Sequence, residues 1–374
     1  MKFTIVAPFF LTCWLASTHP SAAQSAAPKS DAARMENESV VFCSDLDPRR
    51  ARLLFDPTKV ESVRSANGAT TYEEGKDYRL LDHGRMELTP NSRIPVLKYY
   101  GDKADKKSQL YGFKDSKGRA FYSPGDNQKH NDYDVVVTYT HANGLLEQLM
   151  NGAWEAGMTT ALKKLEFKQP LKVAFFGDSI TFGAQASSLG AGCPPNAPAY
   201  PQQVINALKS LYGYSDIQFV NPSVGGKNSE WGLQEIKQVT GASPDLVVLA
   251  FGMNDASGRM KTEKYRANIE GMIKVLRGQN PNVSILLVAE FSPNPEWPAA
   301  NYPLRAQNRE SLYSLHKAYE NTAFVDVGMV SRRMAERKKF QDFSGNNINH
   351  PNDFLHRIYA DLIMKTLRGE KDHP

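Results

Sequence analysis

The chain has 374 residues, of which 41% are hydrophobic, and its 45 Lys and Arg against 40 Asp and Glu leave a net charge of +5. A chain this apolar can bury a core, which excludes a disordered acidic or basic tail. The length suggests two domains, and the mild charge, without a basic run interleaved with aromatic residues, argues against nucleic-acid binding. Three cysteines, none in a CxxC pair, exclude a disulfide framework and disfavour structural zinc. No metal or cofactor is expected.

The N-terminus has the pattern of a signal peptide over residues 1–23. A positive start precedes an apolar run at 3–16, which is too short to span a bilayer comfortably, and small residues follow at the cleavage position. Residues 24–39, rich in Ala, Ser and charge, are predicted to be a disordered leader. We expect a secreted or periplasmic protein with no membrane span in the mature chain. Cleavage would leave Cys43 and Cys193, which could pair in an oxidising compartment.

Residues 40–166 have the composition of β structure. The β-branched and aromatic run at 135–140 predicts a strand, and residues 80–81 and 86–89 flank a hairpin-like turn at 82–85. Short strands with frequent Gly, Asp and Pro fit a small β-sandwich-like accessory domain. Such a domain could bind a glycan or buttress a cleft.

Residues 167–374 alternate short apolar runs with amphipathic stretches, which predicts a flavodoxin-like three-layer α/β sandwich around a parallel sheet. The runs at 246–251 and 285–288 are apolar on both faces, as parallel strands covered by helices are. Residues 351–367 begin with proline and carry apolar residues at helical spacing, which predicts a final helix. Further strands are expected at 173–176, 217–220 and 324–327, and further helices at 200–211, 231–239, 265–277 and 304–319.

Polar residues follow three of the predicted strands, where a doubly wound sheet binds its ligands. Ser179 stands on a tight turn after the first strand. A glycine pair ending at Gly226 follows the second and can present a backbone N–H, and Asn254 follows the third and can turn its amide toward a developing oxyanion. His350 lies in a loop before the last helix and could reach the serine. Each residue alone is explained by a turn or a cap, whereas the combination predicts a hydrolytic site.

Ser, Gly, Asn and His in this chain order resemble the SGNH hydrolases, also called GDSL esterases or lipases, over roughly residues 171–367. The resemblance implies the SGNH hydrolase fold, with Ser179 as the nucleophile. It also implies three oxyanion donors, namely the N–H of Ser179, the N–H of Gly226 and the side chain of Asn254. The general base implied by the resemblance is His350.

The last block of the family is commonly Asp-x-x-His-Pro, and this chain departs from it because Asn347 stands three residues before His350. A neutral amide cannot stabilise an imidazolium as a carboxylate does. His350 could therefore work with Asn347 or a backbone carbonyl as a Ser–His dyad. A carboxylate such as Asp342 or Asp353 could supply the missing partner. Alternatively, the base could be His356, paired with Asp353.

The stretches 221–231 and 251–257 are similar to the carbohydrate-esterase-like branch of the SGNH group, whose members remove O-acetyl groups from polysaccharides. With the signal-peptide pattern, this resemblance predicts a secreted esterase that hydrolyses short-chain esters, in particular O-acetyl groups, through an acyl-enzyme on Ser179. Its expected partner is an acetylated polysaccharide or another small ester. The alternatives are a general short-chain esterase, lysophospholipase or thioesterase, and a non-catalytic glycan-binding protein with a degenerate triad.

Overall fold

The computed structural model describes residues 32–101, 110–125, 130–189 and 192–368. The predicted signal peptide lies outside these residues. The described residues from Ala32 onward form one compact unit. Strand β1 (Ala32–Cys43) begins inside the predicted leader, so the leader is ordered from residue 32 onward, because this segment pairs with a strand far along the chain.

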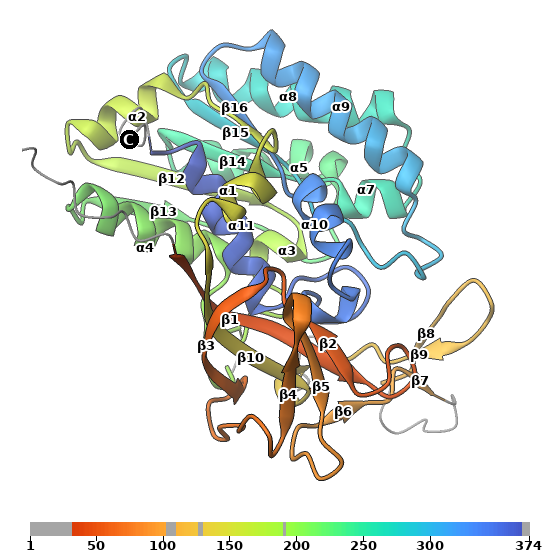
Figure 1. Ribbon diagram of the computed structural model, residues 1–374. Coiled ribbons are helices and arrows are strands. Elements are labelled where there is room, and N and C mark those ends of the chain that lie inside the picture. The colour runs from red at the N-terminus through yellow and green to blue at the C-terminus, as the bar shows by residue number, and fades with distance from the viewer. Residues whose placement is uncertain (1–31, 102–109, 126–129, 190–191, 369–374) are drawn as a thin grey trace, which may run out of the picture. The chain divides into compact units, whose positions relative to one another are not determined.

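A six-stranded sheet forms the centre of the α/β part (Figure 1). Its strands are β11 (Trp154–Glu155), β12 (Leu171–Gly177), β13 (Ile217–Val220), β14 (Leu246–Ala250), β15 (Ser284–Ala289) and β16 (Thr322–Asp326). The order is β11-β16-β15-β14-β12-β13, in which β12 to β16 are parallel and β11 is an antiparallel edge strand. Every residue of β14 and β15 is buried. The predicted parallel sheet is confirmed, and β11 is an addition to it.

Helices cover both faces of this sheet, so the three-layer prediction is confirmed as well (Figure 1). The helices are α1 (Leu145–Met150), α2 (Thr159–Glu166), α3 (Ser179–Phe182), α4 (Tyr200–Tyr212), α5 (Ser229–Glu235), α6 (Lys237–Thr240), α7 (Met253–Ser257), α8 (Thr262–Gln279), α9 (Tyr302–Ala318), α10 (Val327–Ala335) and α11 (Asp353–Lys365). One face packs against α2, α4, α10 and α11, and the other against α5, α6, α8 and α9. Strand β12 shows the alternation, because Phe175 faces the first layer and Phe176 the second.

The preceding region is built of small antiparallel pairings. Its strands are β1, β2 (Arg50–Arg52), β3 (Pro57–Ser65), β4 (Tyr78–Leu81), β5 (Arg85–Leu88), β6 (Val96–Leu97), β7 (Tyr100–Gly101), β8 (Phe113–Lys114), β9 (Ala120–Phe121) and β10 (Asp134–Ala142). They form three sheets, β3-β10-β1-β6, β2-β5-β4 and β7-β9-β8, of which the first also holds one parallel pair, β1 with β6. The predicted hairpin is present as β4 and β5 around a 3₁₀ turn, η1 (Asp82–Gly84). The β character is confirmed, whereas a β-sandwich is not.

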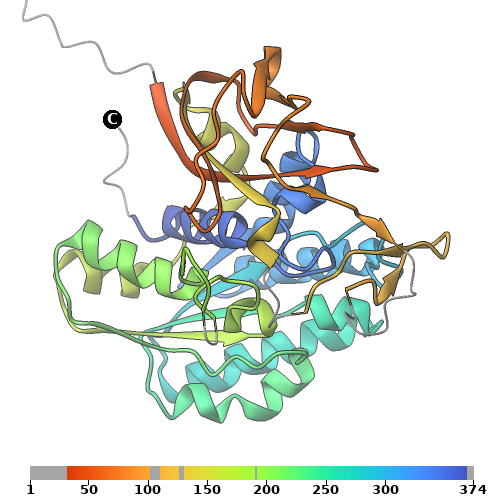
Figure 2. The ribbon, with the colours of Figure 1, turned by 90° about the horizontal axis from the view of Figure 1, so that it is seen from below.

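The β region and the α/β part share one hydrophobic core, to which β1, β10 and α11 all contribute. Helix α11 lies against β1, as Figure 2 shows, and Arg357 of α11 donates to Met35 Sδ at 3.1 Å. The 3₁₀ turn η3 (Phe340–Asp342) is tied to β1, because Asp342 Oδ1 accepts the Val41 N–H at 2.8 Å. The domain boundary between residues 166 and 167 stays a prediction.

A buried ion pair joins the two regions, and breaking it is expected to destabilise the protein. Glu38 Oε1 lies 2.5 Å from Lys338 Nζ with both side chains fully buried, and Glu38 also accepts from Tyr139 Oη at 2.5 Å. Lys338→Met would leave a buried carboxylate without its cation, so we expect the free energy of unfolding to fall by about 3–5 kcal/mol in urea titrations. Lys339→Met is the matched control, because this ammonium donates to the exposed carbonyl of Arg50, and an equal loss in both variants would contradict the prediction.

The two cysteines of the described chain do not form the disulfide that the sequence left open. Cys43 is buried at the end of β1, and burial raises the pKa of its thiol to about 12. Cys193 Sγ accepts a hydrogen bond from Asn131 Nδ2 at 3.5 Å. The contacts of Cys43 and Cys193 in this structure therefore form without a disulfide bond.

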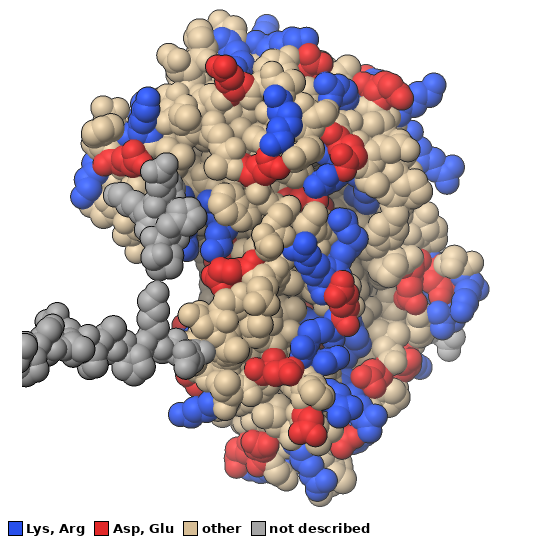
Figure 3. All heavy atoms as spheres, turned by 45° about the horizontal axis from the view of Figure 1, so that its top comes forward, with Lys and Arg blue, Asp and Glu red and all other residues tan. Residues whose placement is uncertain are grey.

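Within the described ranges, no helix is long and apolar enough to cross a membrane. On the face shown in Figure 3, basic and acidic side chains lie interspersed. The net charge of +5 is therefore not gathered into one basic patch on that face.

Candidate active site

The order of the central sheet reverses beside β12. From β12 the chain passes to β13 on one side and then to β14 on the other. Doubly wound sheets bind ligands outside the carboxyl ends of their strands at such a reversal. Ser179 follows β12 and Asn254 follows β14, so both predicted site residues stand at the expected place.

Ser179 is presented by a sharp turn between β12 and α3. Asp178 caps α3, because its Oδ1 accepts the N–H of Ile180 at 2.9 Å. Only glycine fits at 177, since a Cβ there would lie 2.3 Å from the carbonyl oxygen of Ala250 on the neighbouring strand. Ser179 is 8% exposed, so its hydroxyl is recessed but open to a small reactant.

The structure brings Ser179 and His350 into contact, with Oγ 2.9 Å from Nε2. These residues are far apart in the sequence and meet because the loop before α11 folds back over the sheet edge. One side chain shapes this loop, because Asn346 Oδ1 accepts three successive backbone N–H groups, of residues 348–350, each at 2.9 Å. The predicted pairing of hydroxyl and imidazole is therefore present, and the catalytic role of each residue stays a prediction.

The glycine pair after β13 lies against the serine. A Cβ on Gly225 would lie 3.7 Å from Ser179 Cβ, and Gly226 has a φ of +75°, which favours glycine. The segment is fastened to the end of β12, because Ser223 Oγ accepts the Gly177 N–H at 2.9 Å. Gly226 thus belongs to the segment that faces the serine, and its part as an oxyanion donor stays a prediction.

Asn254 stands at the first turn of α7 and links two of these segments. Its Nδ2 donates to Asp178 Oδ2 at 3.1 Å and to the Lys227 carbonyl at 2.9 Å. Both amide hydrogens are thus engaged in this state. An oxyanion bound by Asn254 would replace the Lys227 carbonyl, while the bond to Asp178 would hold the amide in place.

Asn254→Ala is expected to lower kcat by on the order of 10²–10³ with a smaller change in KM, because the donor acts on charge that develops in the transition state. Steady-state hydrolysis of p-nitrophenyl acetate measures both constants. Asn301→Ala serves as the control. It removes an amide that donates to the Ala256 carbonyl of α7, the helix that also carries Asn254. A rise in KM alone would rule out the oxyanion role of Asn254.

His356 does not contact the serine. It lies fully buried in α11, where its Nε2 is 3.2 Å from the Ala184 carbonyl and its Nδ1 accepts the Tyr200 N–H at 3.4 Å. Burial lowers the pKa of His356 to about 4, so its ring is neutral at pH 7. These contacts favour His350 over His356 as the base.

The proposed partners of the base are held by other groups. Asp353 Oδ1 accepts the Ser187 N–H at 2.8 Å, and burial raises the pKa of Asp353 to about 6. Asp342 caps η3 and accepts a backbone N–H of β1. Asn347 donates its amide to the Tyr122 carbonyl at 3.0 Å. The departure from Asp-x-x-His therefore has a structural role, because Asn347 anchors the loop to the β region.

The sequence did not reveal how the β region supports the His350 loop. Asn294 Nδ2 donates to Tyr99 Oη at 2.8 Å and to the Asn347 carbonyl at 2.7 Å, while its N–H donates to the Ile348 carbonyl at 2.8 Å. The sequence also did not single out Glu290, which follows β15 and accepts the N–H that precedes Asn254. No local pattern marks these residues, because their contacts come from segments far apart in the chain.

A parallel sheet with serine, glycine, asparagine and histidine segments gathered at its carboxyl edge is the arrangement of an SGNH hydrolase. Residues 175–358 match the GDSL-like Lipase/Acylhydrolase family. This part of the chain belongs to that family, and the protein is a carboxylic ester hydrolase. Among the described residues, no three His, Cys, Asp or Glu side chains gather as metal ligands would.

Two solved structures show likeness to the chain at low identity. A catalytic mutant of Axe2, an acetylxylan esterase from Geobacillus stearothermophilus, is 20% identical with a TM-score of 0.44, and the match covers 53% of this chain and 94% of that one. A two-domain esterase active on acetylated mannans is 24% identical with a TM-score of 0.46, covering 59% of this chain and 57% of that one. No curated protein matches the chain.

Proposed function

We propose that this protein is a secreted serine esterase that removes short acyl groups, acetyl above all, from a polysaccharide. The contact of Ser179 Oγ with His350 Nε2 at 2.9 Å supports this proposal most directly. A serine hydroxyl is a weak nucleophile at neutral pH and needs such a base within hydrogen-bond reach. A degenerate glycan-binding protein would have no need to keep this contact.

In the proposed mechanism, Ser179 Oγ attacks the ester carbonyl while His350 Nε2 takes the hydroxyl proton. The negative carbonyl oxygen would be held by the N–H groups of Ser179 and Gly226 and by the amide of Asn254. His350 then gives the proton to the leaving alcohol, which leaves an acyl-enzyme on Ser179. Water, deprotonated by His350, attacks the acyl carbon and releases the carboxylic acid and the free serine.

Two sequence features support a secreted enzyme with a polymeric substrate. The signal-peptide pattern of residues 1–23 supports export, and the stretches around residues 221–231 and 251–257 resemble carbohydrate esterases. Phe182, three residues after the serine, and Val224, directly before the glycine pair, are exposed apolar side chains that could pack against a sugar face. A small acyl group fits the recessed position of the hydroxyl.

The test compares acyl chain length and then substrate class. We expect kcat/KM for p-nitrophenyl acetate to exceed that for the octanoate ester by at least about tenfold, which corresponds to about 1.4 kcal/mol. Acetylated xylan and acetylated mannan, the polymers of the two solved esterases, are the first to be assayed for released acetate. A preference for octanoate, or for an acyl thioester over every acetylated glycan, would favour the alternative of a general esterase or thioesterase.

A further inference from the structure

Glu290, directly after β15, contacts both elements that carry the candidate site. Its Oε2 accepts the Met253 N–H at 2.5 Å, at the start of the helix that bears Asn254. Its carboxyl group also forms a hydrogen bond with that of Asp178, the cap of the helix that bears Ser179. The side chain of Glu290 therefore bridges the nucleophile turn and the predicted oxyanion helix.

Two carboxylate oxygens cannot both accept, so one proton must lie between Asp178 and Glu290. Glu290 Oε1 is buried and has no N–H or O–H donor among the described residues, which is consistent with a contact between the two carboxyl groups. Burial raises the pKa of Glu290 well above its usual range and that of Asp178 to about 6, and this order of the two pKa values favours Glu290 as the carboxyl that keeps the proton. Other groups that act on this pair are Arg305 of α9, Asp255 of α7, His350, and the tyrosines Tyr200, Tyr265 and Tyr359.

We propose that Glu290 is a positioning residue for the Ser179 site, and that its protonated carboxyl holds Asp178 and the backbone at Met253 in register. This inference rests on the proposed function. Asp178 in turn accepts the Asn254 amide, so Glu290 sets the distance between the serine and its predicted oxyanion donor. Loss of the shared proton would place two negative charges side by side and push these segments apart.

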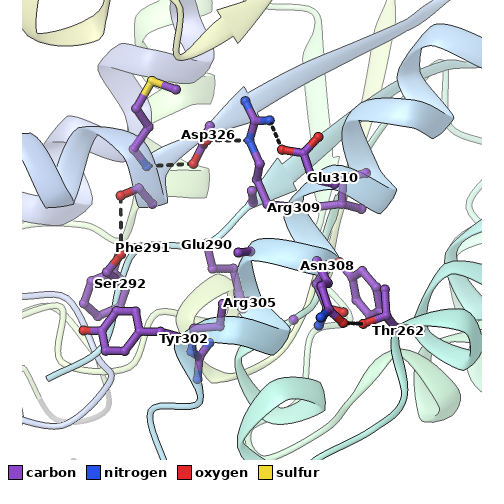
Figure 4. Close-up of a pocket in the computed structure, with 18 of the residues that line it drawn as sticks. Thr262, Glu290, Phe291, Ser292, Tyr302, Arg305, Asn308, Arg309, Glu310 and Asp326 are labelled. Atoms are coloured by element: carbon purple, nitrogen blue, oxygen red, sulfur yellow. Dashed lines mark hydrogen bonds and ion pairs between the residues drawn. The ribbon is translucent and has the colours of Figure 1, made fainter. Parts of the chain in front are cut away.

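The same carboxyl group lines a cavity of about 920 Å³ between α9 and the carboxyl ends of β14 to β16. In Figure 4, Glu290 lies in the middle of this cavity wall, above Arg305 and Tyr302. A small neutral molecule can therefore reach the place of the Glu290 side chain from the cavity. This access permits a chemical rescue experiment.

Glu290→Gln and Glu290→Leu distinguish the hydrogen bonds of Glu290 from the space that its side chain fills. A glutamine can accept the Met253 N–H with its oxygen and donate its amide to Asp178, so we expect kcat for p-nitrophenyl acetate within about threefold of the wild type. Leucine offers neither bond, and we expect kcat to fall about 10²-fold with little change in KM, because misplaced reacting groups cost that much. Equal turnover of the leucine variant and the wild type would overturn the proposal.

The pH profile tests the shared proton. In the wild type, kcat should fall at alkaline pH as Glu290 loses its proton, because its pKa is raised and the pair then repels. In Glu290→Gln, which has no proton to lose, this alkaline fall should be absent. An unchanged alkaline limb in the glutamine variant, or a glutamine variant as impaired as the leucine one, would contradict the shared proton.

Rescue with formamide covers the case in which the leucine variant does not fold. Glu290→Ala should regain activity with added formamide, which can replace both bonds, whereas Glu310→Ala, at another carboxyl of the same cavity wall, should keep wild-type activity and show no such effect. Absence of rescue in folded Glu290→Ala would count against the proposal. An inactive wild type would instead contradict the proposed function, since every comparison here is made against it.

Discussion

Ser179→Ala is expected to abolish ester hydrolysis in a folded protein, with turnover of p-nitrophenyl acetate lower by on the order of 10⁴-fold or more. The hydroxyl lies 2.9 Å from His350 Nε2, within hydrogen-bond reach of the proposed base. Only the attacking atom is removed. Binding of the substrate should therefore persist, and the loss should fall on kcat.

Ser257→Ala is the matched control for this loss. Its hydroxyl donates to the Met253 carbonyl within α7, at the same edge of the sheet but within its own helix. We expect its turnover to stay within about threefold of the wild type, since removal of one such bond costs roughly 1 kcal/mol. Near-normal turnover in Ser179→Ala, with an unchanged thermal unfolding curve, would refute the assignment of the nucleophile.

His350→Ala is expected to lower turnover by on the order of 10⁴-fold, because Ser179 would lose the base that takes its proton. The loss should appear in kcat for p-nitrophenyl acetate at every pH between about 6 and 9. An external base that fits the vacated space, such as imidazole, should restore part of the activity.

His356→Ala is the comparison that decides between the two histidines. Its ring is bound between the Ala184 carbonyl and the Tyr200 N–H, so its removal should lower the free energy of unfolding more than the turnover of folded enzyme. A larger loss of turnover in His356→Ala than in His350→Ala would move the base into α11.

The sequence predicts the α/β part well because its elements have strong local patterns. The apolar runs at 246–251 and 285–288 became β14 and β15, and the final helix begins at Asp353, two residues after the predicted proline. The edge strand β11 has only two residues, too few for any period to appear. In the β region, strand identity was predictable, but β1 pairs with β10 across about a hundred residues, which no local pattern specifies.

The residues of the candidate site likewise divide into those that the sequence predicts and those that only the structure reveals. Ser179, Asn254 and the glycine pair follow strands, and the rule for doubly wound sheets places them together. His350 was predicted from its place in the family resemblance, and the contact with the serine supports that choice over His356. Glu290 was not predictable, because a single acidic residue after a strand looks like any surface residue until Asp178 is found beside it.

The His350 loop is supported by Tyr122 directly and by Tyr99 through Asn294, which makes the β region hard to exchange. A detachable sugar-binding module could be swapped or lost during evolution while hydrolysis continued. Here, an insertion or a register shift between residues 97 and 122 would move the Tyr122 carbonyl, to which the Asn347 amide donates. The loop that carries the His350 imidazole would move with it. The β region therefore shapes reactivity through the backbone of the His350 loop, with or without a contact to a sugar.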